Sequence, residues 1–255
     1  MRDNAAPDSP AEADPPRPSA CDILEDNTIK LTRCRGKSLA GNESFGYRIG
    51  QDRFLHLEEA IYLFDRGFLD VFSNGKELGL QELHTLLPIS GVPLSYLLVY
   101  QHLRAQTFYT VRHSPQRHAI LHKIEERLSQ LDPSTPRTKA TMQSDSVLSE
   151  LREKLRQHAR IPLANLRSLQ LDCYKPGMGT YSSACPGVPD FCVAIAPYNR
   201  SASGSTNNSD LTFDEIQVLM REAQSAALKI ATVSDSGIVI MLGVTDSGVP
   251  ILTTD

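Results

Sequence analysis

The stretch LHLEEAIYLFDRGFLDVF, residues 55–72, most constrains the fold, because a short amphipathic helix runs through a glycine into a strand. Apolar residues recur at helical spacing from position 57 to 64, and this spacing places Glu58 and Glu59 mostly on the opposite, solvent face. Gly67 suits the left-handed conformation that ends many helices. Phe68–Phe72 is then a short strand. The stretch predicts a helix-to-strand scaffold unit in which the acids face water and carry out no chemistry.

Further helices and a short strand are expected directly after this stretch. Asn74-Gly75 is a tight-turn signal that sends the chain back from the first strand. Helical spacing resumes over Leu80–Leu87, where Pro88 is expected to end the helix. A third helix begins near Leu94 and leads into a strand over Phe108–Arg112. Helices that alternate with short strands predict a compact α+β domain of winged-helix character.

The middle of the chain differs in charge and in pattern. Residues 112–160 carry ten basic and six acidic side chains, a net charge of +4, and four histidines. Two helical stripes, over 120–131 and 147–155, flank the polar segment PSTPRTKATMQSDS. This pattern predicts two helices around a flexible linker. The segment is the best candidate for attracting phosphate, although a solvated helix face explains the same charges.

The last 90 or so residues predict a small α/β domain. Leu166–Tyr174 and Phe191–Ala196 are expected strands, and Thr212 with Glu215 forms the capping box of a helix. Three closing strands follow, at Lys229–Val233, Gly237–Leu242 and Val249–Leu252. The predicted organisation is a disordered, proline-rich tail (1–20), an N-terminal α+β domain (21–113), a basic helical linker (114–164) and a C-terminal α/β domain (165–255).

Several classes of protein are disfavoured. There is no secretory leader and no apolar run of the roughly 18 residues that span a membrane, so we expect an intracellular chain. The five cysteines include no CxxC pair, which argues against a disulfide framework or a zinc finger and favours reduced thiols. The histidines lack the spacing of metal ligands, and no phosphate loop or dinucleotide fingerprint is present. We therefore predict no metal and no cofactor.

The C-terminal domain is poor in groups that transfer protons at neutral pH. No histidine follows His158, and Lys175 and Lys229 are the only lysines beyond that point. A reaction in this domain would have to use a carboxylate, a tyrosine or a group from another chain.

Three motifs in this order, LHLEEAIYLFDRGFLDVF, GKELGLQELHTLL and VYQHLRAQTFYTVR, resemble the N-terminal module of tRNA-splicing endonuclease subunits. The resemblance is strongest to the non-catalytic structural subunit of the Sen fifty-four type. LDCYKP, PGVPDFCVAI and ATVSDSGIVIML resemble the family's small C-terminal domain, which has a restriction-endonuclease-like fold. Together the similar regions cover about residues 30–112 and 166–255. One departure is Ala105-Gln106-Thr107, where the family usually ends its third helix with glycine.

The resemblance implies where catalytic groups would stand. Active subunits use a tyrosine, a histidine and a lysine to make the ribose 2′-hydroxyl attack the adjacent phosphate. The histidine position holds Pro189-Asp190 here, and the lysine position is Ala226. Lys229 lies three residues too late, and an odd shift along a strand turns a side chain to the other face. Tyr174 and Tyr181 are better explained as a core and a loop residue, so we predict no catalytic residues.

The resemblance therefore implies a nuclear, structural subunit of the complex that excises introns from precursor tRNA. Its partners would be the catalytic and other non-catalytic subunits and the precursor tRNA, with no membrane. The expected partner-binding edge is the last strand, with Val249, Ile251, Leu252 and Thr253, although an ordinary edge strand is an equal alternative. A loop over 200–210 could also insert into a partner. The expected contacts to the tRNA backbone are Arg112, Arg117, Lys123, Arg127 and Lys139.

Three other functions stay open. An active endonuclease subunit with a rearranged site would use Lys229 or Tyr174. A DNA-binding winged-helix regulator or a general interaction adaptor is also possible. A regulator would need a basic recognition helix, whereas the Leu80–Leu87 segment has Glu82 and no lysine or arginine.

Overall fold

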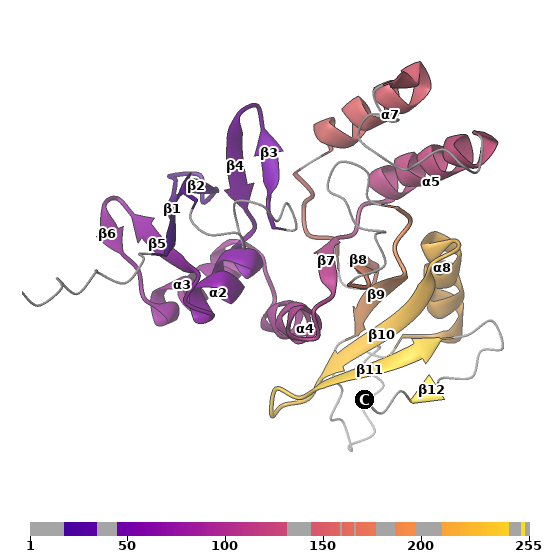
Figure 1. The fold of residues 1–255 in the computed structure, drawn as a ribbon. Helices are drawn as coiled ribbons and strands as arrows, with labels where there is room; N and C mark the ends of the chain where they lie inside the picture. The colour runs from indigo at the N-terminus through magenta and orange to yellow at the C-terminus, as the bar shows by residue number, and fades with distance from the viewer. Residues whose placement is uncertain are drawn as a thin grey trace, which may run out of the picture.

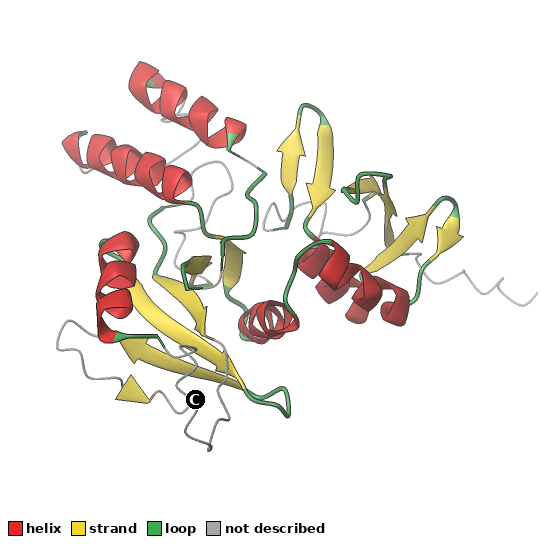
Figure 2. Cartoon of the chain, turned by 180° about the vertical axis from the view of Figure 1, so that it is seen from behind, coloured by secondary structure: helices red, strands yellow, loops and turns green. Residues whose placement is uncertain are grey.

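The computed structural model describes residues 18–34, 45–131, 144–158, 160–165, 167–176, 187–196, 211–244 and 251–252. It is a mixed α/β structure in which these residues form two six-stranded sheets. Figures 1 and 2 show the two sheets on opposite sides of a central helix, with a pair of helices extending from the junction. No helix in the described part is long and apolar enough to cross a membrane.

The first sheet has the strand order β3-β4-β2-β1-β5-β6. Strands β1 and β5 are parallel, and the other neighbours are antiparallel. The predicted hairpin turn at Asn74-Gly75 joins β5 to β6, and both residues have positive φ angles. The strand bounds are β1 Ser19–Ile23, β2 Ile29–Arg33, β3 Tyr47–Ile49, β4 Asp52–Leu55, β5 Leu69–Ser73 and β6 Lys76–Glu77.

The last residues of the predicted disordered tail belong to the folded part of the chain. Strand β1 begins at Ser19, and both Ser19 and Ala20 are buried, with exposures of 1% and 5%. The short strand was hidden from the sequence reading because prolines precede it directly, while its hydrogen-bonding partner β5 lies about fifty residues downstream. The rest of the predicted tail, residues 1–17, lies outside the described residues.

Three helices, α2 (Leu57–Asp65), α3 (Leu80–Ile89) and α4 (Leu94–Ala105), end in the same way. In each, a residue with positive φ follows the cap, and two backbone N–H groups donate back to the last turn. Gly67 ends α2 as predicted. Gly91 follows the cap of α3, and Pro88 lies inside the helix, which continues to Ile89, so the expectation that Pro88 ends it is wrong. Thr107, with a φ angle of 70°, takes the glycine position of α4.

The second sheet has the order β12-β11-β10-β9-β8-β7. Strand β7 pairs with β8 in this sheet, although its sequence position suggested the N-terminal domain. The predicted domain boundary at residue 113 therefore does not separate the two sheets. The strand bounds are β7 Tyr109–Arg112, β8 Leu169–Tyr174, β9 Phe191–Ala196, β10 Ala227–Val233, β11 Val239–Val244 and β12 Ile251–Leu252.

Helices cover both faces of this sheet. On one face α4 packs against β7, β9, β10 and β11, and on the other α8 (Phe213–Ala223) packs against β8, β9 and β10. Alternate residues of β9 divide accordingly: Phe191 and Val193 belong to the core on the α4 side, and Cys192 and Ala194 to the core on the α8 side. Because the α4-side core also contains residues of the first sheet, the two sheets share one hydrophobic core.

The predicted two-helix connection is confirmed. Helices α5 (Pro115–Gln130) and α7 (Ser146–Gln157) pack against each other through a small separate core that includes Ile124 and Leu151. Figure 1 shows this helix pair projecting away from both sheets. The linker between them, residues 132–143, lies outside the described residues. The polar segment of the pattern thus separates two helices that pack against each other.

Candidate functional site

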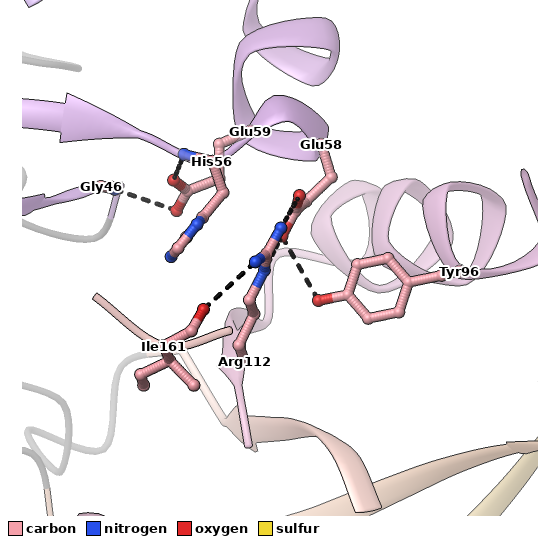
Figure 3. Close-up of polar contacts among 7 residues, drawn as sticks. All are labelled: Gly46, His56, Glu58, Glu59, Tyr96, Arg112 and Ile161. Atoms are coloured by element: carbon pink, nitrogen blue, oxygen red, sulfur yellow. Dashed lines mark hydrogen bonds and ion pairs between the residues drawn. The ribbon is translucent and has the colours of Figure 1, made fainter. Parts of the chain in front are cut away.

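A buried ion pair joins the first helix to the second sheet (Figure 3). Two nitrogens of the Arg112 guanidinium, Nε and Nη2, each donate to one of the Glu58 carboxylate oxygens at 2.7 Å. The remaining Nη1 donates to the backbone oxygen of Ile161 at 3.1 Å, and the Tyr96 hydroxyl donates to Glu58 at 3.4 Å. The two charged side chains are only 11% and 1% exposed. This geometry fixes α2, α4, β7 and the segment after α7 at one point.

The prediction that Glu58 and Glu59 face solvent is wrong. Both are buried, with exposures of 1% and 5%. Burial alone would raise the pKa of Glu58, but the charge and hydrogen bonds of Arg112 outweigh burial and lower it. Helical spacing marks which face is apolar, and it cannot reveal that another element brings a cation to the polar face.

Glu59 has a separate role at the start of α2. Its carboxylate accepts the backbone N–H groups of His56 at 2.8 Å and Gly46 at 2.9 Å, which caps the helix and holds the chain before β3. Burial and the neighbouring charge of Glu58 raise the pKa of Glu59 to about 7. Burial and the charge of Arg112 lower the pKa of His56 to about 3. This helix start therefore contains two titratable groups with opposite pKa shifts.

The predicted tRNA contacts do not form one surface in the described part of the chain. Arg112 is used internally by Glu58. Arg127 on α5 pairs with Asp145, the N-cap of α7, at 2.8 Å. Arg117 is half-buried on α5, whereas Lys123 is exposed on the same helix. Lys139 lies outside the described residues. Among the four described residues, Lys123 presents its charge most openly to solvent. Binding of tRNA by any of the five stays a prediction.

The positions that the resemblance assigns to a catalytic histidine and lysine converge. Asp190 directly precedes β9 and Ala226 directly precedes β10, and these parallel strands are neighbours. The Ala227 N–H donates to the backbone oxygen of Asp190 at 3.4 Å. The Asp190 carboxylate accepts the N–H of Lys175 at 2.7 Å, so it serves as a loop anchor. An aspartate and an alanine thus stand side by side at this point.

Lys229 and Tyr174 are held in other ways. The Lys229 ammonium lies over the Phe191 ring, 4.5 Å from its centroid, in a cation–π contact. Ala226 directly precedes β10, and Lys229 is the third residue of that strand. Tyr174 is fully buried at the end of β8, which agrees with its interpretation as a core residue. Tyr181 lies outside the described residues.

The expected partner-binding edge is partly described. Ile251 and Leu252 form β12, which pairs with Gly243 and Leu242 of β11 at the end of the sheet. Both of these residues lie within the predicted strand. Val249, Thr253 and the loop over 200–210 lie outside the described residues. Partner binding at this edge stays a prediction.

The sequence reading missed a buried polar cluster at the junction of β7, β8 and β9. His113, Asp172 and Cys192 each have a ligand atom within 4.8 Å of the others, and all three are buried. Their wide spacing in the sequence gave no signal, because strand pairing alone brings them together. The available hint was that two of them lie in predicted strands.

Comparison with known proteins identifies one region. Residues 26–84 match the family model described as tRNA intron endonuclease, N-terminal domain. The match covers α2, most of the first sheet and the first half of α3. No curated protein sequence matches the chain. The match covers less than a quarter of the chain, and it shows similarity to that N-terminal domain over this region.

Proposed function

We propose that the protein is a non-catalytic, structural subunit of a nuclear tRNA-splicing endonuclease complex. The observation that carries the non-catalytic part is the pair Asp190 and Ala226. The two positions expected to hold a general base and a cation meet at one site, which supports the residue correspondence. Neither position itself supplies an imidazole or an ammonium, so proton transfer and the transition-state charge would lack the groups expected there.

The buried Glu58–Arg112 pair supports a scaffolding role. It ties the region that matches the family model to the C-terminal sheet, and the shared core makes the two sheets one unit. A scaffold that measures distance on a tRNA must hold its parts in fixed positions. Precursor tRNA would then be cut by a catalytic subunit that this chain holds in place.

The last strand is the proposed contact with that subunit. Because β12 has a hydrogen-bonded neighbour on one side only, among the described strands, its free edge can accept a strand from a partner. The exposed Lys123 on α5 is the proposed first point of contact with the tRNA backbone, because phosphate attraction needs only accessible positive charge.

Affinity purification from cells tests this proposal. The tagged chain should bring down nuclease subunits, and the purified complex should cut an intron-bearing precursor tRNA. The variant I251P lacks one backbone N–H of the edge strand. Compared with the wild-type chain, it should reduce co-purification. Isolation of the chain without any nuclease subunit or cleavage activity would favour a general adaptor instead. Cleavage by the chain alone would favour an active enzyme.

A further inference from the structure

The cluster behind β7 offers three different metal-ligand types in one buried place. His113 directly follows β7, Asp172 lies in β8 and Cys192 lies in β9, and their exposures are 2%, 0% and 0%. The His113 Nδ1 atom is 2.7 Å from Asp172 Oδ1, and the Cys192 thiol donates to the same oxygen at 3.3 Å. Three potential ligand atoms thus lie within 4.8 Å of one another.

Hydrogen bonding among the described residues leaves part of this cluster unsatisfied. Asp172 Oδ2 and His113 Nε2 are buried and have no hydrogen-bond partner. Such buried polar atoms are costly unless something pairs with them. His113 Nε2 lies 3.8 Å from Glu222 Oε1 on α8, slightly beyond hydrogen-bond distance. The cluster is therefore polar, enclosed and incompletely paired.

We propose that His113, Asp172 and Cys192 bind a zinc-class divalent cation that joins β7, β8 and β9. One thiolate, one imidazole and one carboxylate suit Zn²⁺, whereas Mg²⁺ and Ca²⁺ prefer oxygen ligands alone. Tetrahedral zinc with bonds of about 2.0–2.3 Å separates its ligand atoms by roughly 3.3–3.6 Å. The 2.7 Å distance from Nδ1 to Oδ1 would lengthen by about half an ångström to reach that spacing, and the 3.3 Å distance from Sγ to Oδ1 already lies at it.

Metal binding would shift one proton within the cluster and release another. Without metal, His113 donates its Nδ1 proton to the Asp172 carboxylate. On binding, Nδ1 becomes a ligand and the imidazole proton moves to Nε2, which faces Glu222. Glu222 then holds the ring as carboxylates commonly hold zinc-bound histidines. The proton released to solvent is the thiol proton of Cys192.

A neighbouring histidine can complete the coordination. The His118 ring centroid lies 5.4 Å from that of His113, and its buried Nε2 has no described hydrogen-bond partner. A water molecule is the alternative fourth ligand. The site would couple the start of α5 to the second sheet, independently of the proposed role in tRNA splicing.

Cobalt titration of the full chain tests the site. The metal-free protein should bind one equivalent of Co²⁺, with visible bands of tetrahedral cobalt and a thiolate charge-transfer band in the near ultraviolet. Zn²⁺ should displace the cobalt and raise Tm by several degrees. C192S should abolish the charge-transfer band, and H113Q should weaken binding at least tenfold.

Two cysteine variants serve as controls. Cys173 is buried next to Asp172 but belongs to the core on the opposite face of β8, and Cys34 is exposed, so C173S and C34S should keep the band. The wild-type titration needs no variant to fold. Absence of saturable Co²⁺ binding by the wild-type chain would overturn the proposal, as would a charge-transfer band that persists in folded C192S.

Discussion

At the residue scale, Thr107 shows the cost of an unusual cap. Gly67 and Thr107 occupy the same position after α2 and α4, with φ angles of 70° in both cases. A left-handed conformation costs a residue with a side chain roughly 1–2 kcal/mol, and the extra freedom of an unfolded glycine returns about half of that. Replacement of Thr107 by glycine would therefore relieve this strain.

We predict that T107G raises the free energy of unfolding by up to about 1 kcal/mol. The matched variant G67A should lower it by a similar amount, because a Cβ at Gly67 would meet no atom within 4 Å and only the backbone conformation is penalised. Chemical denaturation of both variants measures these changes. A destabilised T107G protein would contradict this explanation of the α4 terminus.

Glu59 makes a prediction about pH. Its folded pKa of about 7 lies above the ordinary value of 4.5, so the folded state binds the proton more tightly than the unfolded state. The stabilising contribution is complete below pH 4.5 and is lost as the pH rises to about 7. The variant E59Q should lack this loss, which amounts to about 1–3 kcal/mol.

The measurement is the difference in unfolding free energy between wild type and E59Q across this pH range. His56 acts in the opposite direction, since its lowered pKa favours the neutral ring and its contribution is lost as the pH falls from 6.5 to about 3. Both proteins contain His56, so the difference isolates Glu59. A difference that does not change with pH would mean that Glu59 does not titrate in this window.

At the element scale, the Glu58–Arg112 pair is the joint between α2 and β7. Removal of one partner leaves the other charge buried, so E58A and R112A should each cost about 3–5 kcal/mol, and the double variant should cost less than their sum. R127A, which breaks the more exposed pair with Asp145, should cost about 1 kcal/mol or less. Thermal or chemical unfolding measures the cycle. Equal effects of R112A and R127A would refute the importance of the joint.

The elements themselves were largely predictable, and their connections were not. The α8 capping box at Thr212, the Asn74-Gly75 turn and the Gly67 helix end follow from local chemistry, and the structure has each of them. Membership of β7 in the second sheet depends on pairing with a strand about sixty residues later. Local periodicity carries no information about such distant partners.

The same limit applied to the candidate sites. Glu58 was assigned to solvent because its partner Arg112 is 54 residues away. The cluster of His113, Asp172 and Cys192 was missed for the same reason. By contrast, the family resemblance located the positions of Asp190 and Ala226, and each directly precedes a strand in the structure.

At the scale of the whole molecule, one core and one buried ion pair join the two sheets into a single unit. The family match lies in the first sheet and its helices, while the positions tested for chemistry lie in the second sheet. The proposed function therefore depends on both parts. A structural subunit needs the joint between the two sheets. It needs no acid, base or cation at the positions that directly precede β9 and β10.

The most direct test is the rate at which a reconstituted complex cleaves precursor tRNA when this chain carries both K229M and Y174F. The account predicts a rate within tenfold of wild type, because neither side chain takes part in the chemistry. A general acid, base or charge stabiliser would contribute about 10²–10⁴-fold. A loss of that size, with the complex still assembled and tRNA still bound, would contradict the account and identify the chain as a catalytic subunit.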